Sequence, residues 1–360
     1  MNPQRTSVGL DVHARSVVGC ALDRDTGEVF QRRLTPDHGE IVAWLGDLPG
    51  PVAVTYEAGP TGFGLARALA VAGIACEVAA PSKLVRPVGD RVKTDARDAA
   101  HLARLLHLGQ ITAVTIPTAT QEAARDLVRA REDCRADLMT ARHRVSKLLL
   151  RQGIVYSGGQ AWTGRHELWL RAQRFDNPAL QLSYEAAFDA MLACLDRRNR
   201  LDDAIIAMAA DSEFTPVVHR LGCIRGVATL TAFGLAAEIG DWHRLTGRSI
   251  GAYVGLVPCE YSSGEARSQG GVTKTGNGHV RRLLVEAAWH HRSRYRPGTD
   301  LRRRWALASP AARARGQSAN RRLYTRWSAF DARKKRAIIA NVAIARELAG
   351  WCWSLAVMPD

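Results

Sequence analysis

Two aspartates stand three residues apart in the stretch VKTDARDAAHLARLL, where the sequence predicts the start of a helix. Asp95 and Asp98 would share one face of that helix, because residues i and i+3 are neighbours on a helix surface. The basic residues around the pair are Arg91, Lys93, Arg97 and Arg104. Paired carboxylates can hold a cation, and the basic residues can receive a phosphate backbone that the carboxylates alone would repel.

Two further carboxylates end strand-like runs. Asp11 closes the apolar stretch SVGLDV, and Glu57 closes PVAVTYE. Functional groups of open α/β sheets collect beyond the strand ends, so these two carboxylates are expected to converge with Asp95 and Asp98. Taken singly, each acid has a structural alternative: a strand-end turn, or the first turn of a helix, where the helix dipole favours acids.

Four convergent carboxylates could not all stay ionised without a cation. Oxygen ligands of this kind suit Mg²⁺ or Mn²⁺, which also bind substrate phosphates. Two such ions about 4 Å apart can stabilise both the attacking and the leaving oxygen in phosphoryl transfer. The sequence therefore predicts a metal site for nucleic-acid chemistry at Asp11, Glu57, Asp95 and Asp98.

The elements that must position these acids predict an α/β layer arrangement. Strands are expected over the first 35 residues, with a hairpin turning at Asp25-Thr26-Gly27, and again in PVAVTYEAGP and IACEVAAP. Helices are expected in HGEIVAWLGDL, in TGFGLARALAVAG and from about Thr94 to His107. This order places residues 1–118 in one catalytic domain.

The rest of the chain is predicted to be mainly helical. A long charged helix over 119–150, a break at YSGGQAWTG and two helical stretches over about 182–211 suggest a linker or dimerisation arm, residues 119–216. A third domain, 217–360, begins with LGCIRGVATLTAFGLAAEIGDW. This segment is typical either of a helix-hairpin-helix, whose turn contacts a DNA phosphate, or of plain helix packing.

Charge points to a polyanionic partner. The chain has a net charge of +15, and residues 281–345 hold fifteen Arg and two Lys against three acids, an excess of +14. Nucleic acid is the commonest polyanion in a cell. The candidate contacts are Arg267, Lys274, Arg281, Arg282, Arg302, Arg303 and Arg304.

Other classes of protein are disfavoured. The seven cysteines form no C-x-x-C pair, so neither a zinc ribbon nor a disulfide framework is indicated. No signal peptide opens the chain, and no run of 18 apolar residues could span a bilayer. These features predict a soluble cytoplasmic protein, associated with the nucleoid and not with a membrane.

The loop PCEYSSGEARSQGGVTKTGNG contains Ser262, Ser263 and Ser268. A serine in a Gly-rich loop is usually a turn residue, and no G-x-S-x-G motif marks a hydrolase. The loop is nonetheless rich in backbone N–H donors, and Arg267 and Lys274 could hold a phosphate there.

The motifs GLDVH, YEAGP and VKTDARDAAHLARLL closely resemble the DEDD motifs of the Piv-type insertion-sequence transposases. The segments LGCIRGVATLTAFGLAAEIGD, GAYVGLVPCEYSSGEARSQGGVTKTGNGHVRRLL and NVAIARELAGW resemble that family's transposase domain. The resemblance implies an amino-terminal RuvC-like domain with a ribonuclease H fold, a helical arm and a mainly α carboxyl-terminal transposase domain.

The resemblance also implies a mechanism and partners. A catalytic serine comes from a P…SG loop in that family, and Ser263 before Gly264 matches its position, although Ser262 stands beside it. The DEDD carboxylates would be the metal ligands. Donor and target DNA, a structured noncoding guide RNA and a homo-oligomer, dimer or tetramer, with an active site shared between subunits, are implied as partners.

Two other functions stay open. One is a metal-dependent, structure-specific nuclease, similar to a Holliday-junction resolvase, without serine chemistry. The other is a non-catalytic nucleic-acid-binding relic, which the intact carboxylates and Ser263 argue against. A covalent protein–DNA adduct that depends on Ser263 would distinguish a recombinase from a nuclease.

Overall fold

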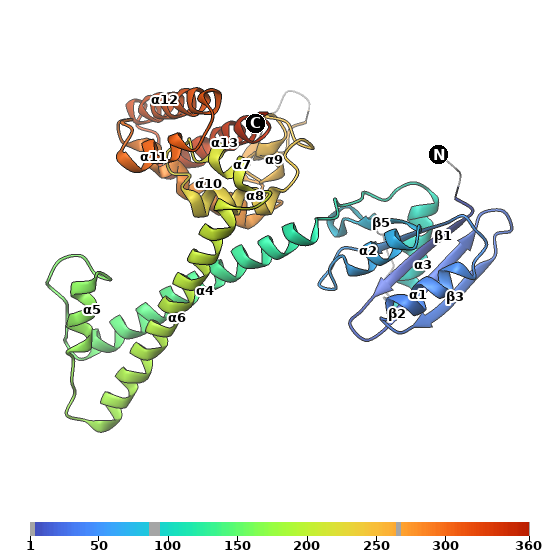
Figure 1. Cartoon of the computed structure of the whole chain (residues 1–360), viewed down its shortest axis with the longest axis horizontal. Helices are drawn as coiled ribbons and strands as arrows, with labels where there is room; N and C mark the ends of the chain where they lie inside the picture. The colour runs from blue at the N-terminus through green and yellow to red at the C-terminus, as the bar shows by residue number, and fades with distance from the viewer. Residues whose placement is uncertain (1–3, 86–93, 264–267, 360) are drawn as a thin grey trace. The chain divides into compact units, whose positions relative to one another are not determined.

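The structure is a computed structural model that describes residues 4–85, 94–263 and 268–359 (Figure 1). The chain divides into two compact units, Met1–Thr118 and Ala119–Asp360. The first contains a mixed sheet covered by helices, and the second is mainly helical. This mixed α/β architecture agrees with the fold class expected from the sequence.

The first unit is built on a five-stranded sheet with the order β3-β2-β1-β4-β5. Neighbouring strands β1, β4 and β5 run parallel, whereas β2 pairs antiparallel with both β1 and β3. The hairpin between β2 and β3 turns where the sequence predicts it. The strand bounds are β1 Thr6–Val12, β2 Val17–Asp23, β3 Val29–Leu34, β4 Val52–Glu57 and β5 Ala75–Ala79.

The alternation of β1 separates the two faces of this sheet. Val8 and Leu10 are fully buried in a core with side chains of α1 (His38–Gly46) and α2 (Gly64–Val71). Successive residues of a strand point to opposite faces, so Gly9 and Asp11 face the other side. That side is covered by α3 (Asp95–His107).

Gly9 allows α3 to lie directly on β1. A Cβ at this position would be 2.1 Å from the carbonyl oxygen of Ala99 and 2.4 Å from the amide nitrogen of Ala103. Both atoms belong to the backbone of α3, so they can move away only if the helix moves. The missing side chain therefore sets how closely the middle of α3 approaches β1.

Replacing Gly9 with Ala should destabilise the first unit by at least about 2 kcal/mol, because overpacking at a rigid contact forces backbone shifts. The free energy of unfolding from urea titration measures this loss. Gly46→Ala is the matched control, since a Cβ there would meet nothing within 4 Å. Equal stability of the two variants would show that α3 adjusts without cost.

The second unit begins with two long helices, α4 (Ala119–Arg151) and α6 (Pro178–Ala210), which pack against each other. Their distal halves share a small core of their own with Leu170 of α5 (Gly164–Arg171). Figure 1 shows α5 beside the end of this hairpin. Its role as a linker or dimerisation arm stays a prediction.

The helices of the hairpin differ from the predicted ones. The sequence suggested two helical stretches over about 182–211, but α6 is one continuous helix that begins earlier, and α5 was not predicted. The Asn177 side chain accepts hydrogen bonds from the amides of Ala179 and Leu180, and Pro178 occupies the first turn. This is a strong helix start. No Gly or Pro follows inside α6, so nothing interrupts the helix.

The remaining helices enclose the largest core, in which Phe233 and Trp327 are fully buried. The base of α4 joins this core through Ala124 and Val128. No helix in the described ranges has both the length and the apolar character needed to cross a bilayer. The element bounds are α7 Thr215–Leu221, α8 Thr229–Ile239, α9 Ile250–Tyr253, β6 Pro258–Glu260, β7 Gln269–Val272, α10 Gly278–Trp289, α11 Thr299–Ala306, α12 Pro310–Ala332 and α13 Ala337–Ala356.

The turn between α7 and α8 is packed within the protein. Gly226 has a φ of +84°, and a Cβ there would be 2.5 Å from the carbonyl oxygen of Ala287. The amide of Arg225 donates to Oδ1 of Asn320 at 2.9 Å, and the amide of Val227 donates to the carbonyl of Ile224. These internal bonds favour helix packing over a phosphate-binding turn.

One buried carboxylate joins α4, α8 and α10. Glu238, 2% exposed near the end of α8, accepts two hydrogen bonds of 2.9 Å from Arg129 of α4. It also accepts a hydrogen bond of 2.7 Å from Nδ2 of the Asn277 side chain, and its Oε1 lies 3.1 Å from Nδ1 of His279. Burial alone would raise its pKa, but these partners lower the pKa of Glu238 to about 2. We call this group the Glu238 junction.

Candidate metal centre and nucleic-acid contacts

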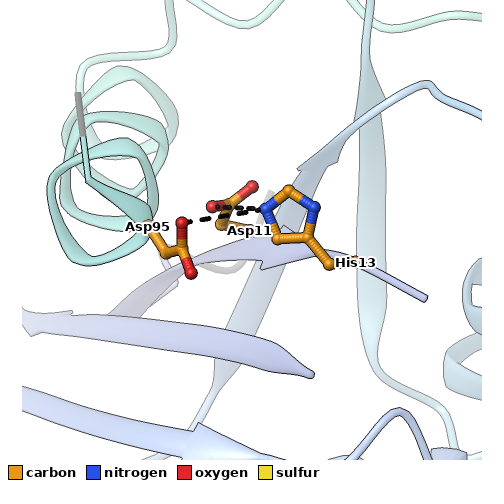
Figure 2. A group of neighbouring side chains, drawn as sticks. All are labelled: Asp11, His13 and Asp95. Carbon is orange, nitrogen blue, oxygen red and sulfur yellow. Dashed lines mark hydrogen bonds and ion pairs between the residues drawn. The ribbon is translucent and has the colours of Figure 1, made fainter. Parts of the chain in front are cut away.

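Three side chains meet at the end of β1 (Figure 2). The ligand atoms of Asp11, His13 and Asp95 all lie within 4.8 Å of one another. Nε2 of His13 is 3.2 Å from Oδ2 of Asp11 and 3.9 Å from Oδ1 of Asp95. Two carboxylates and an imidazole therefore converge on one spot.

The local structure explains this convergence. Asp11 is the last residue but one of β1, and it points away from the core that holds Leu10. Thr94 caps α3 by accepting a hydrogen bond from the amide of Arg97, which starts the helix at Asp95. The close contact of Gly9 with the middle of α3 holds the helix against β1, and the first turn of the same helix carries Asp95.

The electrostatics of the cluster disfavour the ionised form of Asp11 when no cation is bound. Burial raises the pKa of Asp11, whose side chain is 19% exposed, and the negative charges of Asp95 and Asp98 raise it further. The neighbouring His13 opposes this rise only in part. A bound cation would remove the cost of ionising these carboxylates.

Glu57 lies at the same end of the sheet as Asp11. The parallel register pairs Leu10 with Tyr56, so Asp11 and Glu57 follow directly on neighbouring strands. Leu10 and Tyr56 are both buried in the same core, and alternation therefore directs Asp11 and Glu57 to the opposite face. The same-face arrangement that a shared metal site requires is present.

The four predicted carboxylates are not equally close. Among the described residues, the group within 4.8 Å contains Asp11 and Asp95 but neither Glu57 nor Asp98. Asp98 lies in the first turn of α3, near enough for its charge to act on Asp11. The structure thus brings two of the acids, Asp11 and Asp95, close enough to share a cation. Glu57 is exposed at the end of the neighbouring strand.

His13 is the site residue that the sequence prediction missed. It stands two residues after Asp11 in GLDVH, and residues i and i+2 of an extended chain lie on the same side. That spacing was a usable signal. Because Mg²⁺ prefers oxygen ligands, an imidazole is not expected at a site for this ion.

The cluster fits a divalent cation. Its two carboxylates suit Mg²⁺ or Mn²⁺, and an imidazole nitrogen is a common ligand of later transition metals. The partly buried Asp11 provides a fixed ligand, whereas the side chain of Asp95 is 48% exposed and can adjust. His13 can either join the ligands or orient Asp11 through their hydrogen bond.

The predicted serine loop connects β6 and β7. The amide of Tyr261 donates to the carbonyl of Ser268 at 2.9 Å, which brings the two sides of the hairpin together. The hydroxyl of Ser262 donates to Oε1 of Glu260 at 2.9 Å. Ser263 is exposed, and its hydroxyl has no hydrogen bond among the described residues. Arg267 lies outside the described residues.

Three of the predicted basic contacts are held by partners within the protein. Arg281 donates to the carbonyls of Val254 and Thr275 at 3.0 and 2.9 Å. Arg304 donates to the carbonyl of Gly222 at 3.0 Å, and burial lowers its pKa. The third, Arg282, forms ion pairs with both Glu132 and Glu286.

The three other basic contacts that the structure describes are open to solvent. Arg302 and Lys274 are exposed, and Arg303, with a side chain 77% exposed, has only a long contact of 3.5 Å to Asp300. An Arg-rich helix does not reveal from its sequence which arginines its packed face uses. Nucleic-acid binding by all of these residues stays a prediction. The exposed residues can reach a phosphate without losing a partner inside the protein.

Replacing both Arg302 and Arg303 with Ala should weaken DNA binding and reduce the slope of log affinity against log salt by about two. Each lost phosphate contact releases one fewer counterion, and filter binding at several salt concentrations measures the slope. Arg24→Ala, an exposed arginine of the first unit, is the control for a general change in charge. An unchanged slope would place these arginines outside the interface.

Comparison with protein families gives two matches. The model described as "Transposase IS116/IS110/IS902 family" matches residues 218–305, which include α8 and the serine hairpin. A second model, described as "Transposase" and belonging to the DEDD class of IS110 elements, matches residues 8–153. The second match contains Asp11, His13 and Asp95.

Several curated proteins are similar over most of their length. The putative transposase y4qE of Sinorhizobium fredii is 41% identical over 310 residues, which cover 84% of this chain and 74% of that protein. The transposase for insertion sequence element IS1533 of Leptospira borgpetersenii is 30% identical, over 82% of this chain and 87% of that protein. The transposase for IS1328 of Yersinia enterocolitica is 26% identical, over 79% and 84%.

Proposed function

The chain belongs to the IS116/IS110/IS902 family of insertion-sequence transposases, and from this premise we propose that it cleaves and exchanges DNA strands with metal-bound carboxylates and a serine nucleophile. It is an enzyme that acts on DNA, and its first unit has the RuvC-like fold of the DEDD transposases. The observation that supports the proposal most is the convergence of Asp11, His13 and Asp95.

The carboxylates have the binding role in this proposal. Asp11 and Asp95 would hold a divalent cation, with Asp98 and Glu57 completing the negative site as the DNA and the metal bind. The bound cation would supply Lewis-acid stabilisation of the phosphate charge. Asp11 is the anchor of the site, because the packing of α3 on β1 fixes its position. His13 would orient Asp11 through their 3.2 Å contact.

Ser263 is the proposed nucleophile. Its Oγ would form a bond to a phosphorus atom of the DNA while one P–O bond of the backbone breaks. The serine loses its proton and the freed strand end gains one, so the step needs no other reactant. The phosphoserine link conserves the bond energy, and a hydroxyl of another strand can reverse the step to complete exchange.

The choice of Ser263 over Ser262 has structural support. Ser262 donates its hydroxyl to Glu260 and so already has a partner, whereas Ser263 is exposed. A serine hydroxyl is a poor nucleophile until a base or a metal activates it. The family resemblance implies that the DEDD site of another subunit supplies this activation. The proposal therefore includes a homo-oligomer.

A structured guide RNA is the second nucleic-acid partner in this proposal. The excess charge of +14 within residues 281–345 supports a polyanion in addition to the DNA at the carboxylates. The RNA and the DNA compete for similar basic groups, so composition does not assign the segment to either one. Sequencing the nucleic acid that copurifies with the protein identifies the guide.

The test of the serine chemistry is a covalent adduct. Wild-type protein incubated with its DNA, its copurified RNA and Mg²⁺ should give a protein–DNA species that survives denaturation. Ser263→Ala should abolish this species, whereas Ser262→Ala should retain it. Cleavage by Ser263→Ala without any adduct in the wild type would instead favour the metal-dependent nuclease.

A further inference from the structure

The second unit contains a basic cavity that neither the carboxylates nor the serine loop uses. It has a volume of about 870 Å³, within the range of about 300–1,000 Å³ found for sites that hold small molecules. Its walls include four arginines and two tryptophans, namely Arg248, Arg315, Arg326, Arg346, Trp351 and Trp353. This combination of cationic and planar side chains suggests an anionic ligand with a flat ring.

Three elements build the cavity. Helices α12 and α13 form two walls, and the segment before α9 forms the third. Trp353 is fixed, since its Nε1 donates to the carbonyls of Trp242 and Leu245 at 3.2 and 3.0 Å. A Cβ on Gly247 would be 3.3 Å from the Trp353 ring, so the backbone of this segment lies close to the indole.

The cavity has more positive charge than its own acid can balance. Among the described residues, Glu347 is the only acid of the lining, and it already accepts hydrogen bonds from Arg322 at 3.0 Å and from Arg326. Within the described ranges, no acidic side chain pairs with the remaining three arginines. These three, Arg248, Arg315 and Arg346, are all exposed to solvent. An anion such as a phosphate can therefore be bound by side chains that have no other ionic partner.

A planar platform lies beside these charges. The guanidinium carbon of Arg315 is 5.2 Å from the centroid of the Trp351 ring, and its Nε donates to Oγ of Ser354 at 3.1 Å. Both contacts hold the guanidinium over the partly exposed indole. Unstacked nucleic-acid bases stack on aromatic rings and on arginine planes, whereas the bases of a duplex are already stacked on one another.

We propose that this cavity binds one unstacked nucleotide of a single-stranded nucleic acid. Its base stacks on the Arg315–Trp351 platform, and its phosphates bind Arg248 and Arg346. Glu347 is a positioning residue that directs Arg326 toward the cavity. The inference goes beyond the proposed function, because it requires neither the carboxylate cluster nor Ser263.

The test uses the full chain and three labelled probes of one mixed sequence: single-stranded DNA, single-stranded RNA and a duplex. Trp351→Ala should weaken single-strand binding about tenfold, the effect of losing one stacked base, and change duplex binding little. Trp351→Phe should retain most of the affinity. Arg346→Ala should reduce the salt slope for single strands by about 0.7, since one phosphate contact is lost. A loss confined to RNA or to DNA identifies the source of the nucleotide.

Arg321→Ala is the matched control, because Arg321 is an exposed arginine of α12 that does not line the cavity. It should bind all probes like the wild type. An equal loss in Arg321→Ala, or an equal loss for the duplex in Trp351→Ala, would mean a diffuse basic surface and overturn the proposal. Displacement by polyglutamate but not by oligonucleotide would assign the cavity to an acidic peptide.

Two further measurements distinguish a lost binding site from an unfolded variant and from a failure of the catalytic site. Arg346 is exposed, so Arg346→Ala should unfold at the wild-type temperature, and an unaltered salt slope in that folded variant would also overturn the proposal. Asp11→Asn should bind the single-stranded probes normally. Single-strand binding by Asp11→Asn alongside lost cleavage would show that the two sites act independently.

Discussion

Asp11→Asn should reduce DNA cleavage by about a thousandfold or more, while the protein stays folded. The substitution removes one ligand charge from the proposed metal site with little change in volume, and a loss of about 4 kcal/mol of transition-state stabilisation corresponds to this factor. Cleavage of labelled donor DNA in the presence of Mg²⁺ and of the copurified RNA measures the effect. Asp25→Asn is the control, since Asp25 is 66% exposed in the β2–β3 turn, outside the cluster.

The stability of the same variant separates a lost ligand from a damaged fold. The pKa of Asp11 is raised in the folded protein, so its ionisation costs stability without a metal. Asp11→Asn should therefore unfold at the same temperature as the metal-free wild type or at a higher one. It should also lose the increase in unfolding temperature that Mn²⁺ gives the wild type. Cleavage at the wild-type rate by Asp11→Asn would remove Asp11 from the metal site.

Mixing Asp11→Asn protein with Ser263→Ala protein should restore cleavage that neither variant has alone. If the serine of one subunit acts with the carboxylates of another, some sites of a mixed oligomer combine an intact serine with intact carboxylates. The expected effect is large, because the separate variants are essentially inactive. Cleavage measured over a range of mixing ratios should pass through a maximum.

Two controls make this mixing experiment decisive. Differently tagged subunits must copurify, which shows that the variants assemble together. A mixture of either variant with the double variant Asp11→Asn, Ser263→Ala should stay inactive, since no site can then be complete. Normal assembly without recovery at any ratio would show that each chain builds its own active site.

The sequence was sufficient for the framework of the first unit. The apolar run SVGLDV, the hairpin turn at Asp25-Thr26-Gly27 and the helix expected from about Thr94 are local predictions, and the structure has each of these elements. The continuous α6 and the short α5 were harder to predict, because their ends depend on the Asn177 and Thr163 caps within a polar stretch. The predicted break at YSGGQAWTG includes Thr163, so the helix that this residue caps was not expected.

The site was predictable in its location and less so in its members. Asp11, Glu57 and Asp95 could be placed at one sheet end because strand direction and helix order determine that edge. The i, i+2 spacing of Asp11 and His13 places both side chains on the same side of the chain, but their contact also depends on the path of the chain after β1 ends. The internal partners of Arg281, Arg282 and Arg304 likewise depend on tertiary packing, which charge patterns do not specify.

The Glu238 junction makes the base of the α4–α6 hairpin mechanically stiff. Separating α4 from α8 there would leave a buried carboxylate without Arg129, at a cost of about 3–5 kcal/mol. The same carboxylate holds Asn277, which caps α10 a few residues after the serine hairpin. A load applied to the α4–α6 hairpin is therefore transmitted at its base as a push or pull on α10, and the ion pair between Glu132 of α4 and Arg282 of α10 reinforces this coupling.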